Sequence, residues 1–469
     1  MSKRYSILLV IYLFVWIITP VVANSELYVY DFENTTVEKY TYPRIVPRSS
    51  EFKLTANGQE VFVYHTSAGP FAAFSCDGPV MVEIELPKGL RNLSVSPKKH
   101  GIQTEVSENT IRFDISGPKL LALMQNEYPL MYIYANPLER NKPDPDDSSV
   151  HYFTAGQVYE IGDFRLNSNE TLYIEGGAVV RGAIVASMAE NIRIAGHGVL
   201  DGGYFAPTQS RRSILLEGCK HSVIEDIIMI EPTSWMIVLG ASEHITVRGV
   251  KQLGYVSTSD GVDIVGSRHI RVLDSFLRNG DDCIAIKSFN MARYERFASF
   301  DFSANVYDIE INGCIVLANI GGTAFEFGHE LTTDSISDVR FIDCDVLGVH
   351  DHGGVFGIHN ADRAVISNIL YENIRVEHYY NKLIDTRIIK SRYHRDETRG
   401  QVRDVVFRNI DVTVSRYNPG YSISLIGGYD ENHTVENVVF DNFRMNGVKV
   451  TNADQLDLFL KHTKNVIFQ

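Results

Sequence analysis

Short apolar phrases recur along the second two thirds of this chain, separated by glycine, asparagine and aspartate. The phrases begin near Ile192, Ile214, Ile237, Val262, Ile284, Phe325, Val355, Ile384 and Ile423. The first four intervals are 22, 23, 25 and 22 residues, and the longer ones fit the same unit carrying loop insertions on one side. Within each repeat we expect two short strands, as in residues 191–194 and 244–247, with turn residues at the corners.

This pattern predicts an all-β chain whose residues 151–469 form a right-handed parallel β-helix. The apolar phrases are rich in Ile, Val and Phe, and no amphipathic helix of useful length accompanies them. A propeller blade needs about twice this period, and the Leu-x-x-Leu-x-Leu pattern of leucine-rich repeats is absent. One coil of a solenoid for each repeat is therefore the preferred interpretation.

The residues before the repeats show a different pattern. Alternating runs separated by turn residues predict a small antiparallel β-sandwich-like domain over residues 24–140. These runs cover residues 27–30, 61–64, 81–86, 111–115 and 130–134. Residues 141–150 are polar and contain two prolines, which indicates a linker. The acids of this linker could hold a cation, but a solvated connector is the simpler interpretation.

The N-terminus resembles a secretory signal peptide over residues 1–23. Lys3 and Arg4 precede an apolar run over residues 7–18, and small residues end at Ala23. A membrane anchor is the alternative, although the apolar run is short for a span. We expect a secreted or periplasmic protein with no membrane span in the mature chain.

The net charge and the cysteine content limit which ligands and partners the protein is expected to bind. The chain has 469 residues and a formal net charge of −14, which argues against nucleic-acid binding. The charge also argues mildly against a long polyanionic substrate, although a local basic cleft could override it. The five cysteines are too widely spaced for a zinc site, and Cys314 and Cys344 occupy matching repeat positions. We expect them inside the solenoid, with a disulfide left open, no metal or cofactor, and a monomer.

Three aspartates provide the candidate chemistry. Val262 and Ile284 begin the same phrase 22 residues apart, and the same offset relates Asp260 to Asp282. Neighbouring coils would bring this pair roughly 4.8 Å apart along the backbone ladder, beside Asp281. Such acids are common at coil corners, but their matched register favours a site. Inverting glycoside hydrolysis uses such a set, because one acid protonates the leaving oxygen and the others activate water.

The sequence resembles the polygalacturonase-like glycoside hydrolases of family 28, which share a clan with the dextranase and isopullulanase family 49. Their hallmark is Asn-Thr-Asp, followed 21 residues later by an Asp-Asp pair. Here Thr258-Ser259-Asp260 precedes Gly280-Asp281-Asp282 with that spacing. The resemblance covers residues 151–469 and implies an inverting O-glycosidase on a right-handed β-helix. The resemblance implies that Asp281 is the proton donor and that Asp260 and Asp282 bind the nucleophilic water.

The resemblance has two departures. Thr323 occupies the place of the histidine in the family's Gly-His-Gly motif, and His329 aligns instead with Ser288 of the previous coil. The family's Arg-Ile-Lys, which grips a galacturonate carboxylate, is missing from the coil that begins at Gly354. Arg387 and Lys390 follow one coil later and could substitute for the missing pair if the cleft bends, but strand-edge charges are the simpler interpretation. A neutral or differently charged glycan therefore fits better than polygalacturonate.

Four further residues are candidates for binding substrate. Lys287 could contact sugar hydroxyls or steady the carboxylates, and His329 could contact substrate or lie on the surface. Trp235 could stack on a sugar ring or pack at the rim. Asp263, three residues after Asp260, could hydrogen-bond substrate or serve a turn.

Two other functions remain open. A polysaccharide lyase or epimerase could use the same scaffold, but such enzymes abstract a proton beside a uronate and the basic pair is missing. A non-catalytic glycan-binding β-helix would have no reason to gather three acids. The sequence leaves the sugar, the linkage and endo or exo action open.

Overall fold

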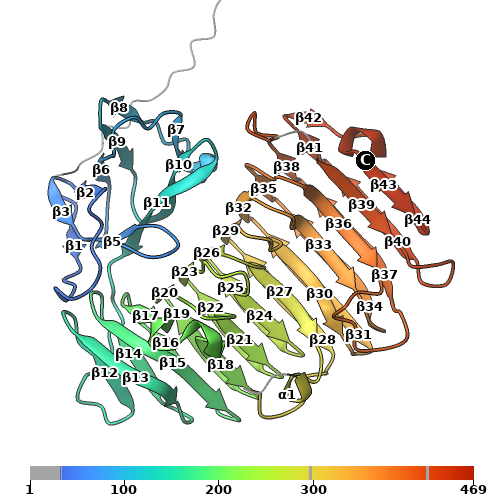
Figure 1. Ribbon diagram of the computed structural model, residues 1–469, viewed down its shortest axis with the longest axis horizontal. Coiled ribbons are helices and arrows are strands. Elements are labelled where there is room, and N and C mark those ends of the chain that lie inside the picture. The colour runs from blue at the N-terminus through green and yellow to red at the C-terminus, as the bar shows by residue number, and fades with distance from the viewer. Residues whose placement is uncertain (1–31, 33, 295–297, 419–421) are drawn as a thin grey trace, which may run out of the picture.

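The structure is a computed structural model, and it describes residues 32, 34–294, 298–418 and 422–469. The predicted signal peptide and the strand predicted at 27–30 lie outside these residues. Two architectures follow one another along the chain: small sheets over the first third and long parallel sheets thereafter (Figure 1).

Two sheets face each other in the N-terminal part, as predicted for a β-sandwich. The first contains β1 (Val37–Lys39), β4 (Val63–Tyr64), β5 (Phe71–Cys76), β7 (Leu93–Ser96), β10 (Lys119–Gln125) and β11 (Tyr128–Pro137). The second contains β2 (Lys53–Ala56), β3 (Gln59–Val61), β6 (Val80–Glu85), β8 (Glu105–Ser107) and β9 (Thr110–Ile115). All pairings are antiparallel except that between β5 and β11, which is parallel.

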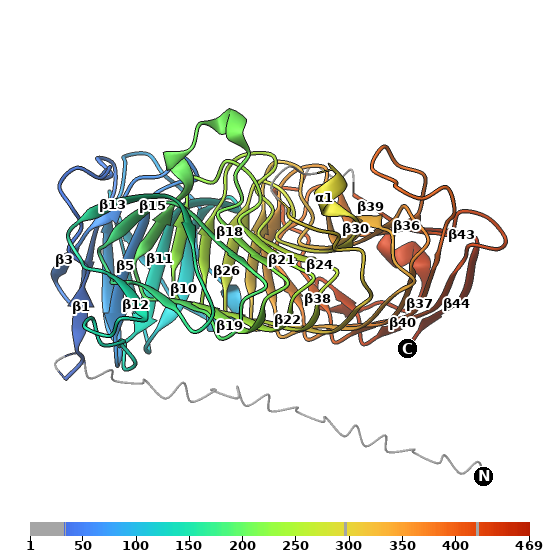
Figure 2. The same ribbon diagram turned by 90° about the horizontal axis from the view of Figure 1, so that it is seen from below.

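A parallel β-helix occupies the rest of the described chain, and its strands lie side by side along its length (Figures 1 and 2). One long sheet contains β12 (Val150–Phe153), β14 (Thr171–Ile174), β16 (Arg193–Ala195), β19 (Lys220–Glu225), β22 (Glu243–Arg248), β25 (Arg268–Leu273), β28 (Val306–Asn312), β31 (Ser335–Ile342), β34 (Val365–Glu372), β37 (Gln401–Arg408), β40 (Val435–Asp441) and β44 (Thr463–Phe468).

The other long sheet takes two strands from most coils. Its strands are β13 (Val158–Arg165), β15 (Val179–Ser187), β17 (Val199–Asp201), β18 (Ile214–Glu217), β20 (Ile228–Ile230), β21 (Ile237–Gly240), β23 (Lys251–Leu253), β24 (Val262–Val265), β26 (Phe276–Asn279), β27 (Ile284–Ser288), β29 (Ile315–Ala318), β30 (Phe325–Leu331), β32 (Asp345–Val349), β33 (Gly354–Asn360), β35 (Arg375–Val376), β36 (Lys382–Ile388), β38 (Asp411–Val412), β39 (Ile423–Gly427), β41 (Arg444–Met445), β42 (Val448–Lys449) and β43 (Leu458–Lys461). A typical coil therefore holds three strands, where the sequence suggested two.

Helices are short and peripheral in the described residues. They are α1 (Met291–Tyr294) and the 3-10 turns Lys98–His100, Gly202–Tyr204, Pro207–Gln209 and Ala453–Leu456. None of these helices is long and apolar enough to cross a membrane.

The register of the coils agrees with the predicted repeat in the middle of the solenoid. Ile237 pairs with Val262, and Val262 pairs with Ile284, so the 22-residue offset that relates Asp260 to Asp282 is confirmed. The start at Ile192 was wrong, because Ile192 precedes a strand of the other sheet. The start near Val355 is offset by one residue, since Phe356 pairs with Phe325, and Ile423 pairs with Lys382 rather than with Ile384. Inserted loops precede these last two starts and remove the fixed period that located the earlier phrases.

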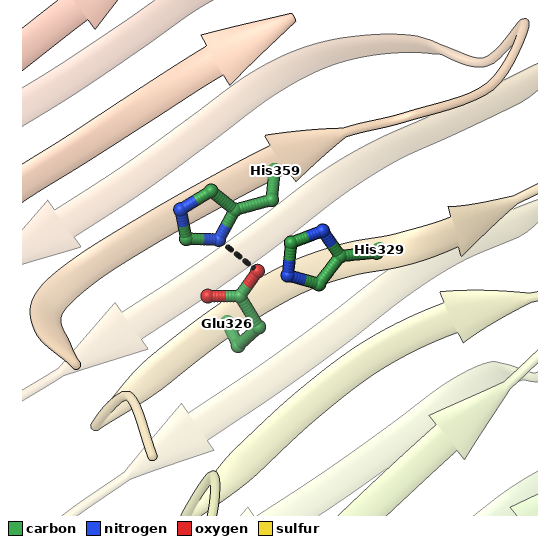
Figure 3. Close-up of side chains that lie close together, drawn as sticks. All are labelled: Glu326, His329 and His359. Atoms are coloured by element: carbon green, nitrogen blue, oxygen red, sulfur yellow. Dashed lines mark hydrogen bonds and ion pairs between the residues drawn. The ribbon is translucent and has the colours of Figure 1, made fainter. Parts of the chain in front are cut away.

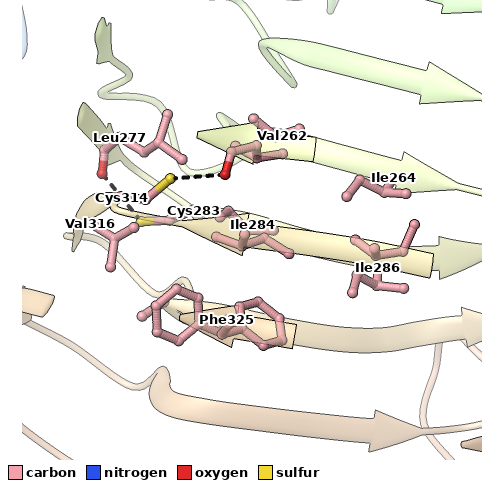
Figure 4. Close-up of a cluster of buried hydrophobic side chains, with 14 of the residues drawn as sticks. Val262, Ile264, Leu277, Cys283, Ile284, Ile286, Cys314, Val316 and Phe325 are labelled. Carbon is pink, nitrogen blue, oxygen red and sulfur yellow. Dashed lines mark hydrogen bonds between the residues drawn. The ribbon is translucent and has the colours of Figure 1, made fainter. Parts of the chain in front are cut away.

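Apolar side chains fill the interior of the solenoid. Val262, Ile284 and Phe325 stack from coil to coil, and Cys283 and Cys314 lie among them (Figure 4). All five cysteines are buried and free, which confirms the inward placement of Cys314 and Cys344.

The N-terminal sheets pack against the β-helix rather than standing apart from it. Tyr132 and Tyr134 of β11 contact the ring of Phe276 edge-on, with ring centroids 5.6 Å apart in both pairs. Ser96 donates a hydrogen bond of 2.6 Å to the buried carboxylate of Glu377 in the β-helix. The boundaries 24–140, 141–150 and 151–469 remain predictions, although β12 begins at Val150.

Candidate active site

A cleft of about 430 Å³ lies on the outer face of the coils that carry β24, β27, β30, β33 and β36. Side chains alternate along a strand, so each of these strands buries one set of residues and presents the other set outward. Among the described residues, six carboxylates line the cleft: Asp260, Asp281, Asp282, Glu326, Glu330 and Asp385. Asp260, Asp281 and Asp282, assigned from sequence to catalysis, are therefore brought to one surface.

Backbone contacts between coils position these three aspartates. The amide of Gly261 donates to the Asp282 carbonyl at 2.8 Å, which ties the segment before β24 to the segment before β27. The Asp282 carboxylate accepts a hydrogen bond of 2.7 Å from the backbone amide of Thr323. Thr323, which replaces the family's histidine, thus contributes to the site through its backbone.

The environment holds protons on two of these acids. Burial, followed by the negative charge of Asp260, raises the pKa of Asp281 to about 7. Burial, followed by the charges of Glu326 and Asp260, raises the pKa of Asp282 well above its ordinary value. Crowded carboxylates cannot all ionise, so the cluster retains a proton near neutral pH. A proton held near pH 7 is what a general acid requires.

Lys287 forms buried ion pairs with two aspartates at the cleft. Its ammonium lies 2.8 Å from Asp260 Oδ2 and 2.8 Å from Asp263 Oδ1, and the Lys287 side chain is 5% exposed. Burial alone would lower the pKa of Lys287, but the charges of Asp260 and Asp263 outweigh it and raise that pKa. Lys287 therefore steadies the carboxylates, one of its two predicted roles.

Asp263 and Trp235 differ in their access to the cleft. Asp263 is fully buried and lies outside the cleft lining, so its contact is Lys287. Trp235 lines the cleft, and the Lys287 ammonium lies 3.9 Å from its ring centroid. This cation–π contact packs the tryptophan against the charge cluster at the rim.

His329 reaches the cleft because the strand register shifts beside it. Ile286 pairs with Phe327, but Ser288 pairs with Leu331, so two extra residues bulge from β30. The expected alignment of His329 with Ser288 was therefore wrong. The His329 ring stacks on His359 with centroids 4.8 Å apart, and burial lowers its pKa to about 4.

A second charged network escaped the sequence analysis. His359 contacts Glu326 Oε1 through Nδ1 at 2.7 Å and Asp385 Oδ2 through Nε2 at 3.1 Å. Burial lowers the pKa of His359, but these carboxylates outweigh it and raise the pKa to about 10. Figure 3 shows His329 beside the bonded Glu326–His359 pair. Glu326, His329 and His359 could each offer a ligand atom to a metal, with these atoms within 4.8 Å of one another.

A protonated His359 explains this cluster without a metal, because both ring nitrogens already face carboxylates. The signal for the network was available in the sequence. Asp263 pairs with Ala285, and Ala285 pairs with Glu326. Glu326 therefore lies in the same column of outward-facing positions, coil above coil, as Asp263. The same column continues through Gly357 to Asp385.

The cations of the cleft are already paired. Arg387 binds both oxygens of Asp385, at 2.5 and 2.9 Å, and Lys382 lies 3.2 Å from the same carboxylate. With Lys287 and His359 also held by acids, each cation described above is neutralised inside the cleft. Arg387 lines the cleft, whereas it was expected to be a strand-edge charge.

Comparison with known proteins agrees with this geometry. The family model described as glycosyl hydrolases family 28 matches residues 175–452, which is more than half of the chain. The chain belongs to glycosyl hydrolases family 28. The family model describes glycosyl hydrolases, enzymes that cleave glycosidic bonds.

Individual relatives of this family 28 chain are distant. A probable exopolygalacturonase C of Aspergillus terreus is 24% identical over 187 residues, 38% of each chain. A probable polygalacturonase of Arabidopsis thaliana is 22% identical over 181 residues, 38% of this chain and 36% of the relative. The chain thus matches under two fifths of the length of these relatives.

Two solved structures share the fold of this family 28 protein. Dex49A from Penicillium minioluteum aligns with a TM-score of 0.66 and 14% identity, covering 90% of this chain and 96% of that one. The exopolygalacturonase from Thermotoga maritima aligns with a TM-score of 0.50 and 16% identity, covering 68% and 83%. Dex49A therefore matches the N-terminal sheets as well as the β-helix.

Proposed function

We propose that this protein is an inverting glycoside hydrolase that cleaves an O-glycosidic bond of a polysaccharide or oligosaccharide. The observation that carries the proposal is the convergence of Asp260, Asp281 and Asp282 on one cleft, with the pKa of Asp281 raised to about 7. Asp281 donates its proton to the leaving glycosidic oxygen. Asp260 and Asp282 hold the water that attacks the anomeric carbon from the opposite face, and Asp260, the carboxylate paired with Lys287, takes the proton that this water releases.

Electrostatics favour a neutral sugar at the bond that is cleaved. A uronate there would bring a further negative charge into a cleft with six carboxylates. Lys287, Arg387 and His359 are each bound to carboxylates, so a uronate would have to break an existing ion pair. Desolvating such a charge without a partner costs on the order of several kcal/mol.

The decisive experiment compares Asp281→Asn with the unaltered protein on a panel of neutral and acidic glycans, counting reducing ends. Loss of the general acid should reduce hydrolysis by about 10²–10⁴-fold while binding persists. Asp454→Asn is a matched control, because Asp454 is exposed on a distant 3-10 turn. Equal hydrolysis by Asp281→Asn and the unaltered protein would contradict the proposal.

Product analysis tests the remaining alternatives. The anomeric configuration of the first product, followed by NMR, should be inverted. A lyase would instead give unsaturated products that absorb in the ultraviolet. If no glycan in the panel is cleaved but some are bound, the β-helix is a glycan-binding protein.

We also propose that the chain is secreted through residues 1–23. The support is the basic start, the apolar run and the small residues that end at Ala23. N-terminal sequencing of the protein recovered from culture medium or periplasm should begin near residue 24. Recovery of the intact N-terminus in a membrane fraction would indicate an anchor.

A further inference from the structure

A second groove continues the cleft toward the C-terminal end of the solenoid. Its volume is about 780 Å³, and Arg387 lines both the cleft and this groove. The outward column that carries Glu326 and Asp385 runs on through Leu425 of β39 to Phe459 of β43. The two hollows are therefore consecutive parts of one face.

Apolar groups form the walls of this groove, and they are exposed. The side chains of Phe459, Tyr429 and Leu460 have exposed fractions of 62%, 44% and 42%. Gly427 and Gly428 also line the groove, and a Cβ on Gly427 would meet no atom closer than 4.0 Å. An exposed aromatic surface suits the apolar face of a sugar ring.

The charge of the groove is opposite to that of the cleft. Its charged lining, within the described residues, is Arg387, Lys390 and Lys461. Lys390 has an exposed partner, Glu397, at 3.8 Å, a contact that stabilises little. Because Asp385 already binds Arg387, the groove offers Lys390 and Lys461 to an anion, on a protein whose net charge is −14.

We propose that this groove is a distal subsite that binds an anionic sugar residue of the same glycan whose neutral linkage is cleaved in the cleft. Tyr429 and Phe459 stack on the sugar ring, and Lys461 with Lys390 binds its carboxylate or sulfate. Five coil steps separate β27 from β43, so the subsite lies about 24 Å along the solenoid from the catalytic coil. The bound glycan therefore spans several residues and carries acidic groups at a distance from the scissile bond.

This proposal rests on the proposed function, but its test measures binding alone. Calorimetry with the full chain in the Asp281→Asn background uses three hexasaccharide probes: an oligogalacturonide, a sulfated galactan fragment and a neutral isomaltohexaose. At least one anionic probe should bind, with affinity that falls as salt rises. The two anionic probes distinguish a carboxylate from a sulfate.

Phe459→Ala and Lys461→Ala should each weaken anionic binding about three- to tenfold. Both residues are exposed, so the fold should persist, which circular dichroism checks. Ile467→Ala and Lys464→Ala on β44 are matched controls, because they are exposed on the other long sheet and should change nothing.

The proposal is overturned if no anionic probe binds, if both groove variants bind as well as the parent, or if isomaltohexaose binds equally through Phe459. Groove binding without hydrolysis of any glycan by the unaltered protein would reject the hydrolase alone.

Discussion

Individual side chains in the cleft have protonation states that they would not have in water. The pKa of Asp281 is raised to about 7 because the carboxyl group is buried and lies near the charge of Asp260. In its proposed role as the acid that donates to the leaving group, Asp281 must be protonated. Hydrolysis should therefore decline as the pH rises through about 7, which a pH–rate profile of kcat/KM measures.

The same raised pKa has a cost in stability. The folded protein binds the Asp281 proton more tightly than the unfolded chain does, so its stabilising effect is complete below pH 4 and is lost as the pH rises through about 7. Asp281→Asn should be more stable than the parent by about 2–4 kcal/mol at pH 8 and should match it at pH 4. Urea denaturation at both pH values tests this, and a constant difference would contradict it.

Lys287 is the residue whose loss should be most damaging. Lys287→Met leaves Asp260 and Asp263 buried without a cation, which should cost about 3–5 kcal/mol of unfolding free energy. The double variant Lys287→Met with Asp263→Asn should recover part of that loss, because it removes one of the unpaired charges. Denaturation of both variants measures the recovery. Equal stability of Lys287→Met and the parent would show that the ion pairs contribute nothing.

At the scale of elements, the turn before β30 fixes the geometry of the acids. A Cβ on Gly322 would lie 1.8 Å from the Asp281 carbonyl carbon, whereas one on the adjacent Gly321 would meet nothing within 4 Å. Gly322→Ala should therefore displace Asp281 and lower kcat at least tenfold, since misplacing a reacting group by about 1 Å can cost 10²-fold. Gly321→Ala is the matched control and should retain activity.

Much of the fold and part of the site follow from strand register. The pairing of Val262 with Ile284 could be predicted because no insertion separates them, and it brings Asp260 beside Asp282. The bulge that carries His329 could not be predicted, because two inserted residues leave the apolar alternation on both sides intact. Glu326 was missed although its column was available, because apolar residues rather than outward positions were aligned.

At the scale of the whole molecule, the N-terminal sheets cover an apolar flank of the solenoid. Ile228, Leu253, Phe276 and Leu317 belong to one buried cluster with Tyr132 and Tyr134 of β11. A chain that begins at residue 150 should expose this flank, bind a hydrophobic dye and aggregate.

The matched control for this truncation carries Phe276→Lys and Leu317→Lys in the shortened chain. These changes should restore solubility if the uncovered flank is the cause. Light scattering compares the two shortened chains. A shortened chain that stays monomeric without them would show that the flank needs no cover.

The buried, unbridged cysteines have a practical consequence. Burial raises the pKa of the Cys283 thiol, so alkylating reagents reach a reactive thiolate there only when its coil opens. Cys283 follows Asp282 directly, whereas Cys76 lies in the N-terminal sheets. Timed alkylation followed by mass spectrometry would therefore measure separately how often the Asp282 coil and the N-terminal sheets open, with no cysteine introduced by mutation.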